Sequence, residues 1–238
     1  MRIKRGLSLA LCLALAVFSA GCAKISIVWN DAEPSRPESS SQTSADVWEY
    51  SGEAYTPLGS APQFSAEELS REPFESYSEL DSLGRCGKAE ALCGRELMPT
   101  GERGSIGSIK PSGWHTVKYD FINGKYLYNR CHLIGWQLTG QNANPKNLIT
   151  GTRYLNTEGM LPFENMIADY IKETGNHVLY RVTPDFREDE SVARGVQIEA
   201  LSVEDGGDGI CFNVYVYNVQ PGVVIDYSTG DSRAEENN

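Results

Sequence analysis

One histidine, one arginine and two asparagines in the middle of the chain have the types and spacing of a hydrolytic site. The run Tyr128–His132 places Arg130 two residues before His132, and Asn147 and Asn156 follow. An imidazole with a pKa of about 6.5 can take up a proton near neutral pH. A guanidinium binds phosphate oxygens, and amide oxygens are ligands for hard cations such as Mg²⁺. Together these groups could hydrolyse a phosphodiester bond.

The elements that must position these residues are short strands and one clear helix. Residues 115–119 and 126–129 predict two strands joined by the turn Asn123-Gly124, a strong hairpin signal. Residues 162–173 predict a helix, because apolar residues recur there at helical spacing and Gly175 follows. Residues 87–97 are also expected to be helical.

The C-terminal third predicts a sheet. Strand-like runs occur at residues 177–183, 196–203, 210–219 and 223–227. The turn at residues 204–209 is expected to join the second run to the third as a hairpin. The pattern predicts an α+β domain with a mostly antiparallel central sheet and few helices.

The charge of the chain is unevenly distributed. The formal net charge is −11 at pH 7, yet residues 81–184 carry 12 basic and 9 acidic side chains, and residues 185–238 carry 3 and 12. An acidic protein binds nucleic acid poorly unless its basic groups converge locally. The net-positive segment holds the candidate site, so the charge neither excludes nor favours a polyanionic partner.

The N-terminus has the pattern of an export signal. Basic residues precede the apolar run at residues 7–18, and small residues stand before Cys22. The sequence around Cys22 resembles a bacterial lipobox, although Ser19 stands where a branched aliphatic residue is usual. We expect residues 1–21 to be a signal peptide and Cys22 to carry a lipid anchor at the cell surface. Simple secretion is the alternative.

Residues 22–72 are expected to form a disordered tether, because they are rich in serine, proline and glutamate. Tyr50 and Tyr55 could dock part of this tether onto the folded domain. Four cysteines lie beyond Cys22, so three disulfide pairings remain open. We expect Cys86, Cys93 and Cys211 to be small buried apolar residues.

Four separated motifs resemble the DNA/RNA non-specific endonuclease family, and most of all the surface DNA-entry nucleases of Gram-positive bacteria. They are Tyr128-Asn-Arg-Cys-His132, Asn144-Pro-Lys-Asn147, Tyr154-Leu-Asn156 and Phe163-Glu164. Their order and spacing extend the likeness over about residues 80–230. The resemblance implies a ββα-metal nuclease fold. We place the domain at residues 73–230, with a disordered tail at residues 231–238.

The resemblance also implies roles for individual residues. His132 matches the general base that takes a proton from the attacking water. Asn156 matches the one direct protein ligand of a Mg²⁺ ion, with Mn²⁺ as a second candidate. Glu164 matches a carboxylate that orients metal-bound water.

Three further residues match supporting positions of the family. Asn147 matches an amide close to the histidine. Arg130 matches the signature arginine, which positions phosphate or the structure around it. Arg103, in the glycine-rich segment at residues 99–113, matches less closely a second arginine that clamps the transition state.

Two residues depart from the family signature Asp-Arg-Gly-His. Asn129 stands where the family has aspartate, and Cys131 stands where it has glycine. Asparagine keeps the shape of aspartate, and cysteine is tolerable only if its φ angle is negative. We interpret the motif as an active variant. A zinc site at Cys131 and His132 is the alternative, without supporting Cys-x₂-Cys spacing.

Each of these residues taken alone has an ordinary explanation, such as a half-buried histidine, a turn asparagine or a first-turn helix acid. His115 and His177 lack such company and are expected to be ordinary sheet residues. The combination predicts an exported, Mg²⁺-dependent endonuclease that acts as a monomer on the backbone of DNA, with RNA as a second candidate. The alternative is a catalytically weak surface lipoprotein that captures DNA.

Overall fold

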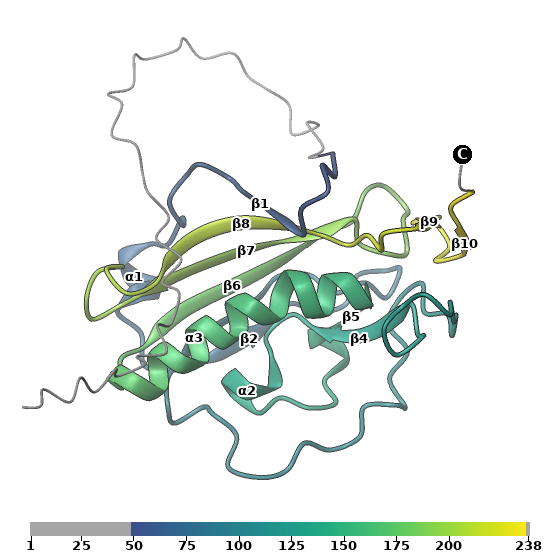
Figure 1. Cartoon of the computed structure of the whole chain (residues 1–238). Coiled ribbons are helices and arrows are strands. Elements are labelled where there is room, and N and C mark those ends of the chain that lie inside the picture. The colour runs from purple at the N-terminus through teal and green to yellow at the C-terminus, as the bar shows by residue number, and fades with distance from the viewer. Residues whose placement is uncertain (1–48, 237–238) are drawn as a thin grey trace, which may run out of the picture. The chain divides into compact units, whose positions relative to one another are not determined.

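The computed structural model describes residues 49–236. Its central feature is a six-stranded antiparallel sheet with the strand order β1-β8-β7-β6-β3-β2 (Figure 1). In that order the strands are Tyr55–Pro57, Cys211–Tyr217, Gly195–Ser202, Val178–Asp185, Ala89–Cys93 and Glu75–Tyr77. The predicted α+β class with a mostly antiparallel sheet is confirmed, as is the hairpin between β7 and β8.

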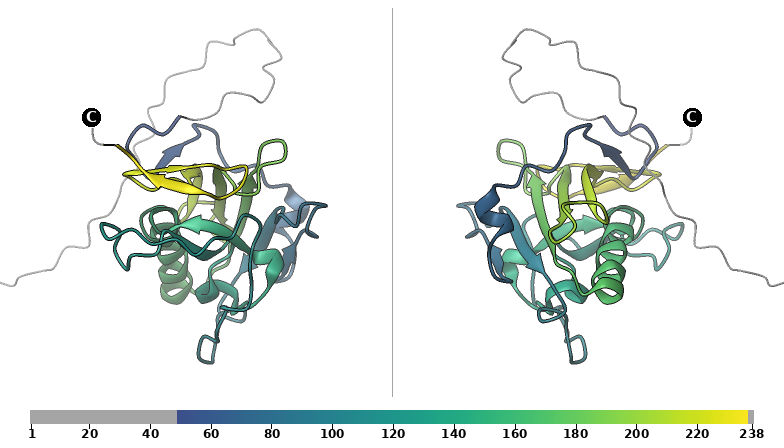
Figure 2. Two further views of the ribbon diagram at one scale, coloured as in Figure 1. Left: turned by 90° about the vertical axis from the view of Figure 1, so that its right-hand side faces the viewer. Right: turned by 90° about the vertical axis from the view of Figure 1, so that its left-hand side faces the viewer.

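Helix α3 (Leu161–Thr174) covers one face of this sheet (Figures 1 and 2). It buries Phe163, Ile167 and Ile171 against alternate residues of β6, β7 and β8, because side chains of a strand that face one side recur every second position. The helix ends at Gly175, whose φ of 78° closes the last turn in a left-handed conformation. The helix predicted at residues 162–173 is therefore confirmed.

A second, two-stranded sheet lies on the same side as α3 (Figure 2). Strand β4 (Tyr128–His132) pairs antiparallel with β5 (Leu148–Thr152), so that His132 faces Leu148 in register. The loop between them holds the short helix α2 (Trp136–Thr139) and the 3₁₀ turn η1 (Pro145–Asn147). After β5, the π-helical turn η2 (Leu155–Met160) leads directly into α3. This ββα unit carries the candidate site.

The hairpin predicted for residues 115–119 and 126–129 forms only in part. Its turn forms, with Gly124 at a φ of 78°, but the pairing is reduced to one bridge between Lys118 and Tyr126. Residues 128–132 pair instead with residues 148–152, a partner that local turn signals cannot reveal. The long-range pairing is stabilised by burial of all five residues of β5.

The helix predicted at residues 87–97 is also wrong, since this segment contains strand β3 (Ala89–Cys93). Strand β3 pairs with β2 on one side and with β6 on the other, and all five of its residues are buried. Its run of mostly small and apolar residues therefore reflects a strand that is covered on both faces of the sheet. The same run has helical spacing, and periodicity alone does not separate the two cases.

The expected tether at residues 22–72 needs correction in its described part. Residues 55–57 form the edge strand β1, and residues 66–69 form the short helix α1 (Ala66–Leu69). Arg181 of β6 ties this segment to the sheet through an ion pair with Glu68 at 2.6 Å, and it also pairs with Glu90 of β3 at 2.6 Å and Glu199 of β7 at 3.3 Å. Tyr55 packs on Phe163 with ring centroids 4.9 Å apart. The folded part therefore begins before residue 73.

The expected disordered tail at residues 231–238 also needs correction. Strand β10 (Ser232–Ala234) pairs antiparallel with β9 (Val223–Ile225). The strand run predicted at 223–227 thus pairs with the tail and not with the main sheet. The expected signal peptide, the lipid site at Cys22 and the tether up to residue 48 lie outside the described residues.

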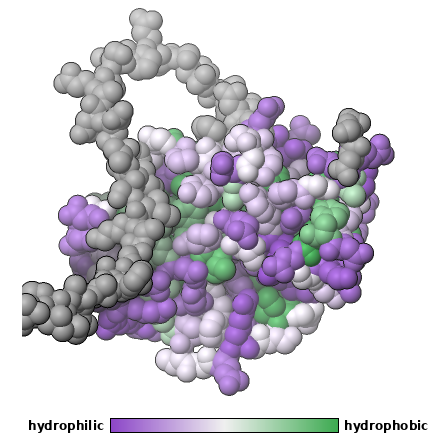
Figure 3. All heavy atoms as spheres, in the orientation of Figure 1, coloured by the Kyte–Doolittle hydropathy of each residue, from purple (hydrophilic) through white to green (hydrophobic). Residues whose placement is uncertain are grey.

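The surface in view is mainly hydrophilic, with small hydrophobic patches (Figure 3). Across residues 49–236, no helix is long and apolar enough to cross a membrane. Cys86 and Cys93 are buried as expected, whereas Cys211 is half-buried at the start of β8. All four described cysteines, including Cys131, are free thiols.

Candidate active site

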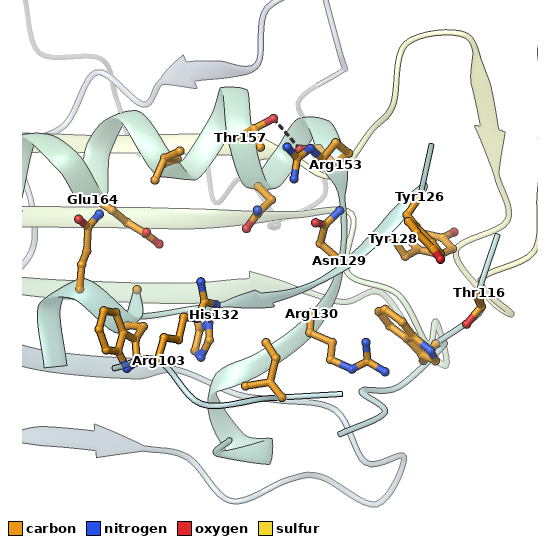
Figure 4. Close-up of a pocket in the computed structure, with 17 residues that line it drawn as sticks. Arg103, Thr116, Tyr126, Tyr128, Asn129, Arg130, His132, Arg153, Thr157 and Glu164 are labelled. Carbon is orange, nitrogen blue, oxygen red and sulfur yellow. Dashed lines mark hydrogen bonds between the residues drawn. The ribbon is translucent and has the colours of Figure 1, made fainter. Parts of the chain in front are cut away.

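A cavity of about 980 Å³ opens between β4, the loop that follows it and the junction of η2 with α3. Figure 4 shows the side chains that line it. Five of the residues singled out from the sequence contribute: Arg103, Arg130, His132, Asn156 and Glu164. They come from a loop, a strand and two helical turns, so only the tertiary fold brings them to one place.

His132 is held in one orientation at the end of β4. It is 6 % exposed, its Nε2 lies 2.8 Å from the carbonyl oxygen of Asn142, and its Nδ1 lies 3.3 Å from Nη2 of Arg103. A carbonyl can only accept and a guanidinium can only donate, so this network assigns the proton to Nε2 and leaves a lone pair on Nδ1. Burial lowers the pKa of His132, and the charge of Arg103 acts in the same direction. The imidazole is therefore a neutral acceptor near pH 7.

Arg130 anchors the loop that brings Arg103 to the histidine. Its Nε donates to the carbonyl of Ile109, its Nη2 donates to the carbonyl of Gly107 at 2.9 Å, and its guanidinium stacks 4.0 Å from the ring centre of Trp114. The glycine-rich loop is thus attached to β4 next to the histidine. Arg130 lines the cavity, but its described contacts are structural.

Asn156 and Glu164 present oxygen atoms to the same cavity. Asn156 lies on η2 and Glu164 on the first turn of α3, eight residues later, so the continuous helical segment sets their spacing. In the described part of the chain the Asn156 side chain has no hydrogen-bond partner, and Glu164 forms no ion pair and has only Gln137 as a hydrogen-bonding neighbour. Burial raises the pKa of Glu164 to about 7, with Arg103 acting against this shift.

Glu164 is packed against the backbone of Gly135. A Cβ atom at position 135 would lie 2.4 Å from one carboxylate oxygen of Glu164, so a glycine is needed for this close approach. Gly135 also precedes α2 and lines the cavity. No signal in the sequence marked this glycine.

Asn147 does not line the cavity. It is 0 % exposed, and its amide clamps the chain just after the histidine: Nδ2 donates to the carbonyl of Ile134 at 2.9 Å, and Oδ1 accepts from the Ile134 N–H at 2.9 Å. Its own carbonyl accepts from the N–H of Leu133 at 2.9 Å. The amide is near the histidine as expected, and it acts on the backbone and not on a ligand.

Cys131 does not point into the cavity either. Its side chain is fully buried in the main core, and burial raises its pKa far above the usual range. A Cβ atom at Gly151, across the β4–β5 pair, would lie 2.3 Å from its Sγ. The cysteine is therefore accommodated by a glycine on the paired strand. It lies in regular β-strand backbone and is absent from the positive-φ residues of the described chain.

The other two histidines lie elsewhere. His115 contacts the carbonyl of Thr229 at 3.0 Å, and His177 lies between Glu96 and Glu204, which raise its pKa. Within residues 49–236, no group of three or more histidine, cysteine or acidic side chains could hold a metal ion. The zinc alternative at Cys131 and His132 has no support, because the cysteine faces the core.

The cavity is strongly cationic for an acidic protein. Its lining contains three arginines and a single acidic residue, Glu164. None of the ion pairs among the described residues involves Arg103, Arg130 or Arg153. The sequence did not single out Arg153, because a lone arginine after a strand carries no signal. The local excess of unpaired positive charge favours an anionic ligand.

The ββα unit and the site it carries define a ββα-metal nuclease fold, as its solved neighbours show. Residues 66–204 match the family model of the DNA/RNA non-specific endonucleases. This match covers more than half of the chain, and the chain belongs to that family. The family resemblance and the fold class predicted from the motifs are confirmed.

Two solved structures and one curated protein illustrate the relationship. NucA from Streptococcus agalactiae, with a magnesium ion bound, is 24% identical with a TM-score of 0.67, covering 75% of this chain and 87% of that chain. Sda1 nuclease, with a bound zinc ion, is 25% identical with a TM-score of 0.63, covering 76% and 97%. A deoxyribonuclease of Streptococcus dysgalactiae subsp. equisimilis is 32% identical over 111 residues, which are 44% of this chain. The match spans 32% of that protein, about a third of its length.

Proposed function

We propose that this protein is a divalent-metal-dependent endonuclease that hydrolyses phosphodiester bonds of DNA, with RNA as a second candidate substrate. The observation that carries the proposal is the oriented, neutral His132, whose Nδ1 lone pair accepts from Arg103 at the wall of a cavity that also holds arginines without ion pairs in the described part of the chain, together with the oxygens of Asn156 and Glu164. Membership of the non-specific endonuclease family supports it. The nuclease names and bound metals of its solved neighbours agree with it.

His132 is the proposed general base. The Asn142 carbonyl holds the Nε2 proton, so Nδ1 is the nitrogen left to take a proton from water, in exchange for the hydrogen bond that it accepts from Arg103 in this structure. Because burial disfavours the imidazolium, the base stays neutral and active down to acidic pH. A positioned base of this kind contributes about 10²- to 10⁴-fold to the rate.

Arg103 is the proposed phosphate clamp. Its guanidinium lies 3.3 Å from the basic nitrogen, so a phosphate bound to it is adjacent to the water that His132 activates. Fixed donors aimed at the developing charge stabilise the transition state without reorganisation. Its positive charge also opposes premature protonation of the histidine.

Asn156 and Glu164 fit a divalent cation, because hard cations prefer oxygen ligands and no cationic side chain forms an ion pair with Glu164 within residues 49–236. We propose Mg²⁺, with Mn²⁺ as a second candidate. Asn156 would hold the ion through its amide oxygen, and Glu164 would orient water beside it. The bound cation supplies charge neutralisation at the phosphate and the leaving oxygen. Arginines and a metal ion that contact only the phosphate backbone do not recognise individual bases. This fits an enzyme without sequence specificity.

The test is a cleavage assay with protein that begins at residue 49 and therefore retains β1 and α1. Plasmid DNA, single-stranded DNA and RNA are each incubated with Mg²⁺, with Mn²⁺ and with EDTA. We expect cleavage only with a divalent ion, and a loss of at least about 100-fold in His132→Ala. His115→Ala, at a histidine outside the cavity, serves as the matched control and keeps full activity. Full activity of His132→Ala would overturn the mechanism, and metal-free DNA binding without cleavage would favour the capture protein.

We also propose that the chain is exported, anchored at the cell surface through a lipid on Cys22, and monomeric. The support is the basic and apolar pattern of residues 1–21 and the lipobox-like sequence that ends at Cys22. Metabolic labelling with palmitate and cell fractionation test the anchor. The wild type is expected in the membrane fraction and Cys22→Ser in the medium. A wild type that takes up no palmitate would instead support secretion without a lipid anchor. Light scattering of the released protein tests the monomer.

A further inference from the structure

The cavity extends well beyond the groups needed to cleave one phosphodiester bond. Figure 4 shows Arg103 and Glu164 at one end, near His132. Arg153 and Asn129 lie away from that end, and Tyr126 and Tyr128 continue the wall beyond them. The second end has no role in the chemistry proposed above.

Arg153 has a firmly held backbone and an uncommitted side chain. Directly after β5, its N–H donates to the carbonyl of Leu127 at 2.7 Å, and its own carbonyl accepts from the Thr157 hydroxyl at 2.9 Å. Its guanidinium has no ion pair within the described part of the chain. Its Nε is enclosed by protein and has no hydrogen-bond partner. The fold therefore places a cation at the cavity wall without neutralising it.

Asn129 presents a second donor in the same condition. Its Nδ2 is enclosed and has no hydrogen-bond partner among the described residues. Enclosed donors without acceptors are rare in folded proteins, because each gives up hydrogen bonds to water without replacement. Arg153 and Asn129 both line this cavity, and the protein offers neither an acceptor. The terminal guanidinium nitrogens of Arg153 also donate to no acceptor in the described part of the chain, so an anion in the cavity can accept from them and lie beside Asn129.

We propose that Arg153 and Asn129 form a second phosphate subsite, which binds the phosphate next to the one that is cleaved. The proposal rests on the endonuclease function and names its substrate more closely: a strand with at least two consecutive phosphodiester groups. The amide of Asn129 suits this role, since a carboxylate at the same position would repel the phosphate. Arg153 is a binding residue in this scheme and makes no contact with the reacting atoms.

The sharpest test uses trinucleotides that differ by a single charge. A trinucleotide has two phosphodiester linkages, and replacing either one by an uncharged methylphosphonate leaves one cleavable bond with a neutral neighbour. For the wild type we expect one of the two substituted trinucleotides to show a KM higher by about tenfold than the other, the loss expected for one charge-assisted hydrogen bond. That substrate lacks the charge that Arg153 binds.

Arg153→Gln is expected to raise KM for the unmodified trinucleotide by about tenfold, to change kcat by less than about twofold, and to abolish the difference between the two substituted substrates. Arg153→Lys retains the charge and should restore most of the lost affinity. With longer duplex DNA, the slope of log affinity against log salt should fall by about one in Arg153→Gln. Arg187→Gln is the matched control, because Arg187 also has an enclosed nitrogen without a partner but does not line the cavity.

Equal KM values for the two substituted trinucleotides in the wild type, or a difference that persists in Arg153→Gln, would overturn the subsite. Absence of cleavage of every substrate by the wild type would overturn the proposed function instead. In that case fluorescence anisotropy of a labelled oligonucleotide in EDTA measures binding at the subsite without cleavage. Weaker binding by Arg153→Gln than by Arg187→Gln would support it, and equal binding would overturn it.

Discussion

Replacement of Asn147 by alanine should reduce stability strongly, although this residue touches no ligand. The Asn147 amide makes two hydrogen bonds of 2.9 Å to the N–H and the carbonyl of Ile134. Both residues are 0 % exposed, so water cannot replace the amide without opening the structure. Alanine leaves a buried donor and a buried acceptor without partners.

The expected magnitude follows from these two groups. Each buried backbone group left unsatisfied costs about 1–3 kcal/mol, so Asn147→Ala should lose about 2–6 kcal/mol of unfolding free energy. Domains of this size are stable by about 5–15 kcal/mol, so most of the variant should still be folded at 25 °C. The turn after His132 should shift, so activity should fall. The shape of the pH–rate profile should stay the same, since the base itself is unchanged.

Urea denaturation followed by tryptophan fluorescence measures the loss. Asn165→Ala is the matched control, because Asn165 is exposed and accepts one bond from Gln137; its change should stay within about 0.5 kcal/mol. Asn147→Asp should also be destabilising, because a carboxylate oxygen would face the Ile134 carbonyl in place of the Nδ2 donor. A loss below about 1 kcal/mol in Asn147→Ala would refute the clamp.

Three further predictions concern the site and the sheet. Gly135→Ala should lower activity at least about tenfold with little change in stability, because the new Cβ displaces the flexible Glu164 carboxylate; unchanged kcat/KM would contradict this. Burial raises the pKa of Glu164 from 4.5 to about 7, so the loss of folded stability is absent below about pH 4.5, grows between 4.5 and 7, and is complete above 7. Glu164→Gln in EDTA should therefore be more stable than the wild type by up to about 3 kcal/mol at pH 8 and equal near pH 4.5; thermal melts at both values test this. Arg181→Met should cost about 3–5 kcal/mol, because it leaves the buried carboxylate of Glu90 with only the exposed Lys88 at 3.2 Å, and Arg181→Met/Glu90→Gln should recover part of the loss in denaturant melts.

Local sequence patterns predicted those helices and strands that can be recognised without knowing which distant segment they pack against. The α3 helix carries its own start, apolar stripe and glycine stop, so residues 162–173 were predicted within one residue of each end. Strands β6, β7 and β8 follow one another with short connections, and their alternation predicted them as well. Strand β3 was missed, because burial on both faces removes the alternation that distinguishes a strand from a helix.

The sequence by itself determined the chemistry that the site could perform. The residue types and order of Arg130, His132 and Asn156 predicted a base, a phosphate-binding guanidinium and an oxygen ligand, and the family resemblance added Glu164; all four line one cavity. Sequence motifs identify such groups because their spacing is set locally by one strand and one helix.

Only the tertiary structure decided how these groups are held. It turned Cys131 into the core against Gly151, assigned Asn147 to the backbone and placed Arg103 next to the histidine. It also showed that Arg153 lines the same cavity and has no ion-pair partner in the described part of the chain. Each of these outcomes depends on contacts between segments far apart in the chain, and pairing, burial and the absence of a partner are properties of the folded molecule that no local pattern encodes.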